Sequence, residues 1–370
     1  REVIADGKMA VILGIETSNV FDCFLGGREG YPTCDEAYVI EQLDRYHELG
    51  VRVLFPVHKY DNGFSAGDGH KSFIEVGNFI NSGHWSNFTE DCPDIPTTFD
   101  RGEVSFGGLN MPRDVYDSPA PHDFSGFGAN PIGTIVPFID QLMSPALEGD
   151  WCMNAGLTPL GERLLEAMMR RGMIIEMDHF PRRSYLRAYE IAEADDGAQA
   201  FVDETPGLAG THGLNYEGRI YALGGVSKVG LGRCGEAGDP AAMTRRLNER
   251  VDLIRANGGY PAEGFGFDLN GFAGARGPRF TEGACPEPQE NPVTYPFQSM
   301  AGDVTFTEPR VGERTIDFNM EGFAHIGLLP ELIEDARRTG ATEEDLEPLF
   351  RSAEGYIRMW EAAEARAAEM

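Results

Sequence analysis

TPLGERLLEAMMRRGMIIEMDH (158–179) contains a complete helix-to-strand unit and decides the fold class. Thr158 suits the N-cap of a helix, and Gly172 suits the residue that follows the end of a helix. The apolar run after Gly172 has the composition of a buried parallel strand, and it ends on Asp178 and His179. This stretch therefore predicts a helix that leads into a parallel strand with a histidine at its carboxyl end.

The same alternation of apolar strands and amphipathic helices recurs on both sides of this unit. Strands that alternate with helices indicate a parallel sheet with right-handed crossovers. We therefore expect an α/β fold, and within that class a (β/α)8 barrel of the TIM type. The predicted strands are 10–16, 51–58, 173–179, 207–212, 226–230 and 264–271, and the main predicted helices are 35–50, 158–172, 184–196, 217–225 and 240–259.

Ionisable side chains stand at the carboxyl ends of five predicted strands. A single histidine in such a place is more often a hydrogen-bonded structural residue than a ligand. The repetition is more informative, because the loops at this end of a parallel barrel converge on one mouth, where active sites form. The five residues are Glu16, His58, His179, His212 and Asp268.

These residue types suit a metal site. Imidazole nitrogen and carboxylate oxygen are common ligands of zinc and related divalent ions, so we expect one or two such ions, with zinc as the first candidate. Glu16 is the candidate to bridge two ions, and His179 and His212 are the candidates to bind one of them. Asp268 would accept a proton from a metal-activated water or orient that water, and His58 would donate a hydrogen bond to the tetrahedral intermediate.

A long stretch with little periodicity interrupts the alternation at 60–154. It is rich in Gly, Asn, Ser, Asp and Pro, and a structureless loop of this length is uncommon within a compact domain. We expect a folded insertion or lid there, with a helix within 130–143. The remainder is expected to form a single barrel domain over 1–370, closed by C-terminal helices at 331–370.

The charge of the chain narrows the classes of partner. The chain has 370 residues, of which 41% are hydrophobic, and 60 acidic against 31 basic residues give a formal net charge of -29. Such a surface repels phosphates, so nucleic-acid binding is not expected. The simplest interpretation of this charge is a strongly solvated surface. The alternatives are an acidic funnel that attracts a cationic substrate and adaptation to a salty habitat. No apolar run approaches the ~20 residues of a membrane helix.

The six cysteines predict disulfides and an oxidising compartment. None forms a C-x-x-C pair, and all lie in loop-like sequence, so we expect a secreted or periplasmic protein. Proximity in the chain favours the pairs 23–34, 92–152 and 234–285, although six cysteines allow about fifteen connectivities. Buried free thiols are the alternative. The cysteines are Cys23, Cys34, Cys92, Cys152, Cys234 and Cys285.

Several stretches are similar to motifs of a known family. The stretches GKMAVILGIE, LGVRVLFPVHKYDN, GLTPLGERLLEAMMRRGMIIEMDH, GTHG and FGFDLNG follow one another in the order of that family. They resemble the membrane (renal) dipeptidase-like family, the M19-type peptidases of the amidohydrolase superfamily. The closing helices, from LLPELIEDARRTG onward, resemble the end of the family's chain. The match extends over most of the chain outside the insertion.

The resemblance implies roles for individual residues and an activity. Glu16 falls on the bridging glutamate, His179 and His212 fall on metal ligands, Asp268 on the catalytic aspartate and His58 on a substrate-contacting histidine. The implied activity is metal-dependent hydrolysis of an amide or peptide bond in a small-molecule or peptide substrate.

The family's arginine for the substrate carboxylate has no clear counterpart in this chain. Arg219 is the nearest candidate, and Asn62 is a second residue that would face the substrate at the barrel mouth.

The chain also departs from the family pattern. Thr17 and Ser18 follow Glu16 where the family has two glycines, and Asn270 and Asp178 replace an aspartate and a serine. No His-x-Asp or His-x-His strand precedes Glu16, so the first barrel strands are absent from this sequence. We expect residues upstream of Arg1, a second chain or a homo-oligomer to fill that place. The alternative function is an extracellular binding or assembly module with a degenerate metal site and no catalysis.

Overall fold

In the computed structural model the chain forms two compact units. The first unit comprises Arg1–Glu204, Gly210–Gly225 and Ile357–Met370, and the second comprises Thr205–Ala209 and Val226–Tyr356. Whether the two units make up one barrel domain stays a prediction. The structure describes residues 1–25, 28–68, 72–82, 86, 88–89, 101–104, 145–153, 155–194, 201–203, 213–228, 231, 243–266, 278–280 and 291–370.

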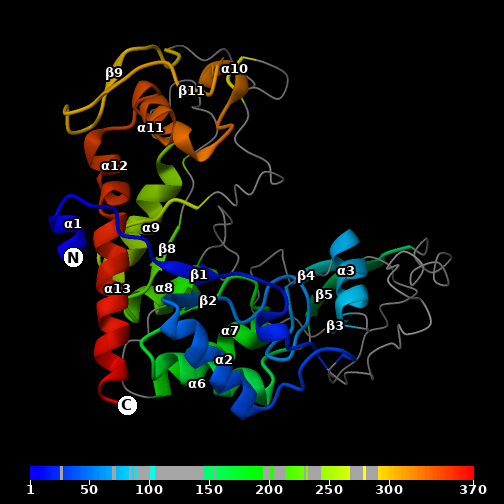
Figure 1. The fold of residues 1–370 in the computed structure, drawn as a ribbon. Helices are drawn as coiled ribbons and strands as arrows, with labels where there is room; N and C mark the ends of the chain where they lie inside the picture. The colour runs from blue at the N-terminus through cyan, green and yellow to red at the C-terminus, as the bar shows by residue number, and fades with distance from the viewer. Residues whose placement is uncertain are drawn as a thin grey trace. The chain divides into compact units, whose positions relative to one another are not determined.

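A parallel sheet organises the first unit. Its strands are β1 (Leu13–Ile15), β2 (Val51–Leu54), β6 (Ile174–Glu176) and β7 (Phe201–Asp203), and they neighbour one another in that order. Every one of these pairings is parallel. The predicted α/β class with a parallel sheet is therefore confirmed (Figure 1). The described residues show no closed barrel, and the eight-stranded barrel stays a prediction.

Three amphipathic helices accompany the sheet. They are α2 (Glu36–Glu48), α6 (Pro159–Met169) and α7 (Arg182–Ala194); α2 packs on α6, and α6 packs on α7 (Figure 1). The side chain of Asp35 accepts from Tyr38 N at the start of α2. The N-cap expected at Thr158 is also present, because its side chain accepts from Gly161 N. The strand-to-helix alternation thus follows the local signals in the sequence.

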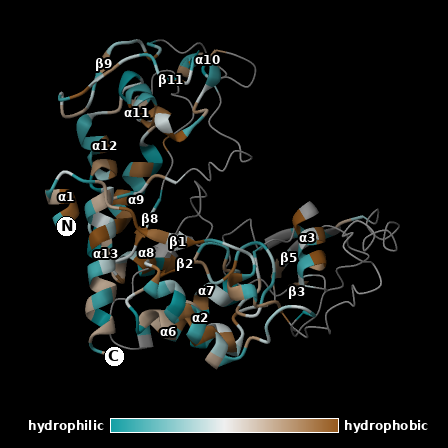
Figure 2. Cartoon of the chain, in the orientation of Figure 1, coloured by the Kyte–Doolittle hydropathy of each residue, from teal (hydrophilic) through white to brown (hydrophobic). Residues whose placement is uncertain are grey.

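The core of this unit lies between the strands and these helices. Figure 2 shows hydrophobic residues on β2 and on parts of the helices, and also on β1, where Leu13 is exposed. The side chains of Ile174 and Ile175 in β6 and of Leu164 and Leu165 in α6 are fully buried. β6 is buried along its whole length, at Ile174 and Ile175 and also at Glu176. The helices α1 (Glu2–Ala5) and α8 (Gly213–Ala222) and the short 3₁₀ helix η1 (Val20–Asp22) also belong to the unit.

The described part of the predicted insertion contains a helix and an antiparallel sheet. The helix is α3 (Ser72–Ser82), and the strands run in the order β3 (Phe88–Thr89), β5 (Leu147–Met153), β4 (Arg101–Val104). A small apolar cluster that includes Phe88, Val104 and Met153 packs this region. A lid role stays a prediction, and the helix expected within 130–143 lies outside the described residues.

The second unit has its own apolar core, in which Leu247, Phe323, Leu332 and Leu346 are buried. The predicted C-terminal helices are present, but two short hairpins that precede them were not expected from the sequence. Its elements are β8 (Val226–Ser227), α9 (Arg245–Ala256), β9 (Phe297–Gln298), β10 (Thr305–Phe306), β11 (Arg310–Val311), β12 (Arg314–Thr315), α10 (Phe318–Glu321), η4 (Ile326–Leu328), α11 (Leu329–Arg338) and α12 (Glu343–Phe350); α13 (Ser352–Ala367) begins in this unit and ends in the first.

The structure contains the first of the predicted disulfides. Cys23 and Cys34 are bonded, with a sequence separation of 11. Cys152 is also disulfide-bonded, but its partner and the predicted 234–285 pair lie outside the described residues. Disulfides are typical of proteins outside the cytosol. Within the described part of the chain, no helix has the length and apolar character needed to cross a membrane.

Candidate metal centre

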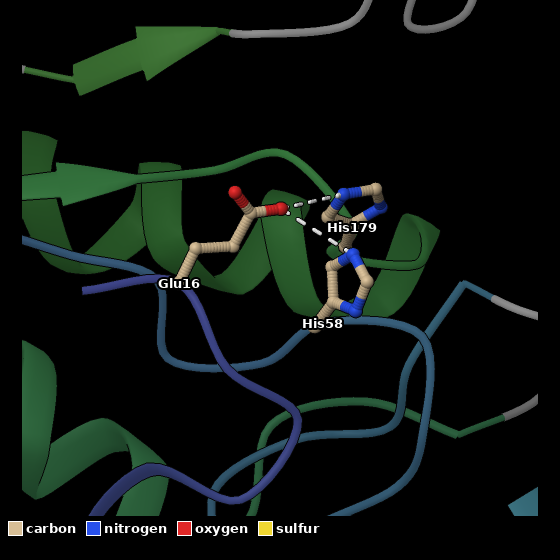
Figure 3. Close-up of side chains that lie close together, drawn as sticks. All are labelled: Glu16, His58 and His179. Atoms are coloured by element: carbon tan, nitrogen blue, oxygen red, sulfur yellow. Dashed lines mark ion pairs between the residues drawn. The ribbon is translucent and has the colours of Figure 1, made fainter. Parts of the chain in front are cut away.

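Glu16, His58 and His179 gather at the carboxyl ends of three adjacent strands. Glu16 follows β1 directly, His58 lies in the loop after β2, and His179 lies in the loop after β6. Figure 3 shows the carboxylate of Glu16 pointing toward both imidazole rings. The parallel order of the strands explains this meeting, because the ends of β1, β2 and β6 open on the same edge of the sheet.

The potential ligand atoms of these residues lie close enough to share one ion. One atom from each side chain falls within 4.8 Å of the others. Nε2 of His58 is 3.3 Å from Oε1 of Glu16, and Nε2 of His179 is 3.7 Å from the same oxygen. The two imidazole rings meet edge to face, with their centroids 4.3 Å apart. The side chain of Glu16 is 44% exposed, so solvent reaches the cluster from its side.

The two histidines have opposite electrostatic surroundings. Burial and the neighbouring His179 lower the pKa of His58 to about 4, against the weaker opposite effect of Glu16. Burial also lowers the pKa of His179, but the carboxylates of Asp68 and Glu16 outweigh it and raise the pKa to about 9. In the metal-free protein at neutral pH, His58 is therefore neutral and His179 carries a proton on each ring nitrogen.

Asp68 is a residue of the site that sequence reasoning missed. Its Oδ2 lies 3.1 Å from Nδ1 of His179, and Nζ of Lys59 lies 3.1 Å from Oδ1. Burial raises the pKa of Asp68, but His179 and Lys59 together outweigh it and hold the pKa well below its usual value. The only available signal was an aspartate ten residues after His58, within a stretch interpreted as an insertion.

Asn62 lies near the site, but every contact that the structure gives its side chain is to backbone. Its Nδ2 donates to the carbonyls of Ser18 and Pro56, each at 2.9 Å. Its Oδ1 accepts from the amides of Phe64 and Ser65. The residue is fully buried and ties the loop after β1 to the loop after β2. The predicted contact of Asn62 with substrate stays a prediction.

Arg219 lies on α8, and its side chain contacts two residues of α7. Its guanidinium forms an ion pair with Glu193 and lies over the ring of Tyr189, 4.3 Å from the ring centroid. A role for Arg219 in binding a substrate carboxylate stays a prediction. The expected ligand His212 and the expected catalytic residue Asp268 lie outside the described residues.

The donor set fits a divalent cation. Two imidazole nitrogens and one carboxylate oxygen are ligands that zinc and similar ions accept. The carboxylate of Asp68 beside Nδ1 of His179 leaves Nε2 of that ring directed at Glu16, as in metal-ligating histidines generally. His58 was expected to contact substrate, and its place in the cluster also makes it a candidate ligand.

Among known proteins, this chain matches solved structures only. No family model matches the sequence, and no curated protein matches it. An amidohydrolase from Pseudomonas aeruginosa is 12% identical, with a TM-score of 0.43, over 98% of this chain and 75% of that one. A metallopeptidase from Rhodobacter sphaeroides, solved with a phosphinate mimic of the dipeptide L-Ala-D-Ala, is 15% identical with a TM-score of 0.41.

A third similar structure is the dipeptidase AC, a metallopeptidase of family M19, which is also 15% identical with a TM-score of 0.41. The match to each of the two peptidases covers 87% of this chain and 59% of the peptidase. The chain thus spans less than two thirds of their length. The solved structures that it matches thus include an amidohydrolase, a metallopeptidase and a dipeptidase of family M19.

Proposed function

We propose that the chain is a metal-dependent hydrolase that cleaves an amide or peptide bond in a small molecule or peptide. The observation that supports this most directly is the cluster of Glu16, His58 and His179 at the ends of adjacent parallel strands. These residues lie 42 and 121 positions apart in the chain (58 − 16 and 179 − 58), so their meeting is a property of the fold. The order of the sequence motifs supports the same activity.

The residues of the cluster have separable tasks. A divalent ion, when bound, would lower the pKa of a water molecule and polarise the scissile carbonyl. Glu16 and His179 would hold the ion, and the buried Asp68 lies beside the ring of His179. His58 lies beside both residues and would either bind the ion through a ring nitrogen or donate a hydrogen bond from its ring N–H to an oxyanion.

The proposal extends to parts of the protein that lie outside the described residues. We assign the second histidine ligand to His212 and the catalytic base to Asp268, in a (β/α)8 barrel with 60–154 as its inserted lid. Zinc is the proposed metal because histidine and carboxylate ligands suit it. The Cys23–Cys34 disulfide supports a secreted or periplasmic location.

Metal content and hydrolysis test the proposal together. The protein is loaded with Zn²⁺, dialysed and analysed for metal by mass spectrometry, and then assayed for release of free amine from a panel of dipeptides and acyl amides. His179→Ala is expected to lose bound zinc and hydrolysis. His47→Ala is the matched control, because His47 lies on α2 and outside the cluster.

Two results would contradict the proposal in different ways. Equal zinc content in the wild type and His179→Ala would show that the cluster is not a metal site. Zinc that depends on His179, with no hydrolysis of any substrate in the panel, would favour the extracellular binding or assembly module.

A further inference from the structure

Asp68 is shared between a candidate ligand and a lysine. Its two carboxylate oxygens lie 3.1 and 3.3 Å from Nζ of Lys59, and Oδ2 also lies 3.1 Å from Nδ1 of His179. The side chain of Asp68 is 10% exposed and that of Lys59 is 22% exposed. Charged groups hydrogen-bonded at this degree of burial interact more strongly than they would in water.

The backbone around Asp68 is also fixed. The amide of Gly67 donates to Oδ1 of the buried Asp61 at 2.9 Å, and the amide of Asp61 donates to Oδ1 of Asn78 at 2.8 Å. A Cβ atom on Gly67 would lie 2.5 Å from the carbonyl carbon of Lys59. Only glycine allows the chain to pass so close to itself, and this approach brings Lys59 and Asp68 together.

The contact with Asp68 determines which nitrogen of His179 is available to a ligand. A carboxylate accepts hydrogen bonds, so Nδ1 of His179 must be the donor. In the neutral ring the lone pair then lies on Nε2, which is the atom that faces Glu16. Asp68 therefore selects both the tautomer and the orientation of the ring.

We propose that Asp68 is a positioning residue for His179 as a metal ligand, and that Lys59 offsets the charge of Asp68 and so weakens cation binding. This inference rests on the proposed function, because it requires that His179 bind a divalent ion. A divalent ion bound at Nε2 adds positive charge beside Asp68 and Lys59. A negative charge at Asp68 favours that binding, and a positive charge at Lys59 opposes it.

The affinity of the full chain for Zn²⁺, measured at one pH by competition with a chromophoric chelator, tests the proposal. Asp68→Asn keeps the shape of the side chain and removes its charge, and we expect it to weaken zinc binding by about 10–100-fold. Lys59→Met removes the opposite charge, and we expect it to tighten zinc binding by about 3–10-fold. Glu190→Gln is the control, since it removes an exposed carboxylate on α7.

The opposite signs separate positioning from a merely structural role. Both substitutions remove the same ion pair, so a role in holding the loop alone would weaken zinc binding in both variants, and this result would overturn the proposal. Unchanged affinity in Asp68→Asn would also overturn it. If the wild type and His179→Ala bind zinc equally, the proposed function fails; if zinc binding depends on His179 and Asp68→Asn binds as the wild type does, only the present inference fails.

Discussion

At the scale of single residues, Asn62 shows how a residue near a site can act through the backbone. All four of its side-chain hydrogen bonds go to main-chain groups of the loops that follow β1 and β2. The carboxylate of Glu16 and the ring of His58 are carried by those same loops. The relative position of these two side chains therefore depends on a residue that has no contact with either of them among the interactions described.

We expect Asn62→Ala to lower the free energy of unfolding by about 2–4 kcal/mol, because it leaves buried amides and carbonyls without a partner. Chemical denaturation of the substrate-free protein measures the loss. Asn257→Ala is the control: its Nδ2 donates to one carbonyl at the end of α9, so its loss should be only about 0.5–1.5 kcal/mol. Unchanged stability in Asn62→Ala would instead favour the predicted contact with substrate.

At the scale of elements, the capping box of α12 offers a test of local stability. The side chain of Thr342 accepts from Asp345 N, and the side chain of Asp345 accepts from Thr342 N at 2.9 Å. Asn248 on α9 donates to the other oxygen of Asp345 at 2.9 Å. Burial raises the pKa of Asp345, but the hydrogen bonds from Thr342 and Asn248 outweigh it and hold the pKa below its usual value.

A carboxyl group whose pKa is lowered on folding stabilises the protein above its unfolded-state pKa of about 3.8, and the contribution is lost as the pH falls through the lower folded-state value. We expect Asp345→Ala to cost about 1 kcal/mol at pH 7. Thermal unfolding of both proteins at pH 7 and pH 3.5 should show a smaller difference at the lower pH. A difference that does not depend on pH would show that the charge of Asp345 does not contribute.

The elements also show what the sequence could and could not predict. The helices beginning at Glu36 and Pro159 and the strand at Ile174 were predictable, because their caps and apolar runs are local signals. The places of Glu16 and His179 at strand ends were predictable for the same reason, and their roles stay predictions. Asp68 did not, since its partner His179 lies 111 residues away and nothing local marks it. The hairpins of the second unit, such as β9 and β10, are two residues long and leave no periodic signal.

At the scale of the whole molecule, the net charge of -29 should make stability depend on salt. Repulsion among the many surface carboxylates destabilises a compact chain, and added salt shortens its range from about 30 Å at 0.01 M to about 8 Å at 0.15 M. We expect the unfolding temperature in the presence of a chelator to rise between 0.01 and 0.3 M NaCl. An unfolding temperature that does not change over this range would show that the local ion pairs already balance the repulsion.

The backbone of His179 has a consequence for which residue suits this position. Its φ of 66° lies in the left-handed region, which glycine adopts easily and which costs other residues about 1–2 kcal/mol. His179→Gly should therefore be more stable than His179→Ala by about 1 kcal/mol in urea denaturation, although both variants lack the ring. Equal stability would show that the turn accommodates a side chain without strain. Glycine suits this backbone best, so the advantage of a histidine here lies in what its ring contacts, the carboxylates of Asp68 and Glu16.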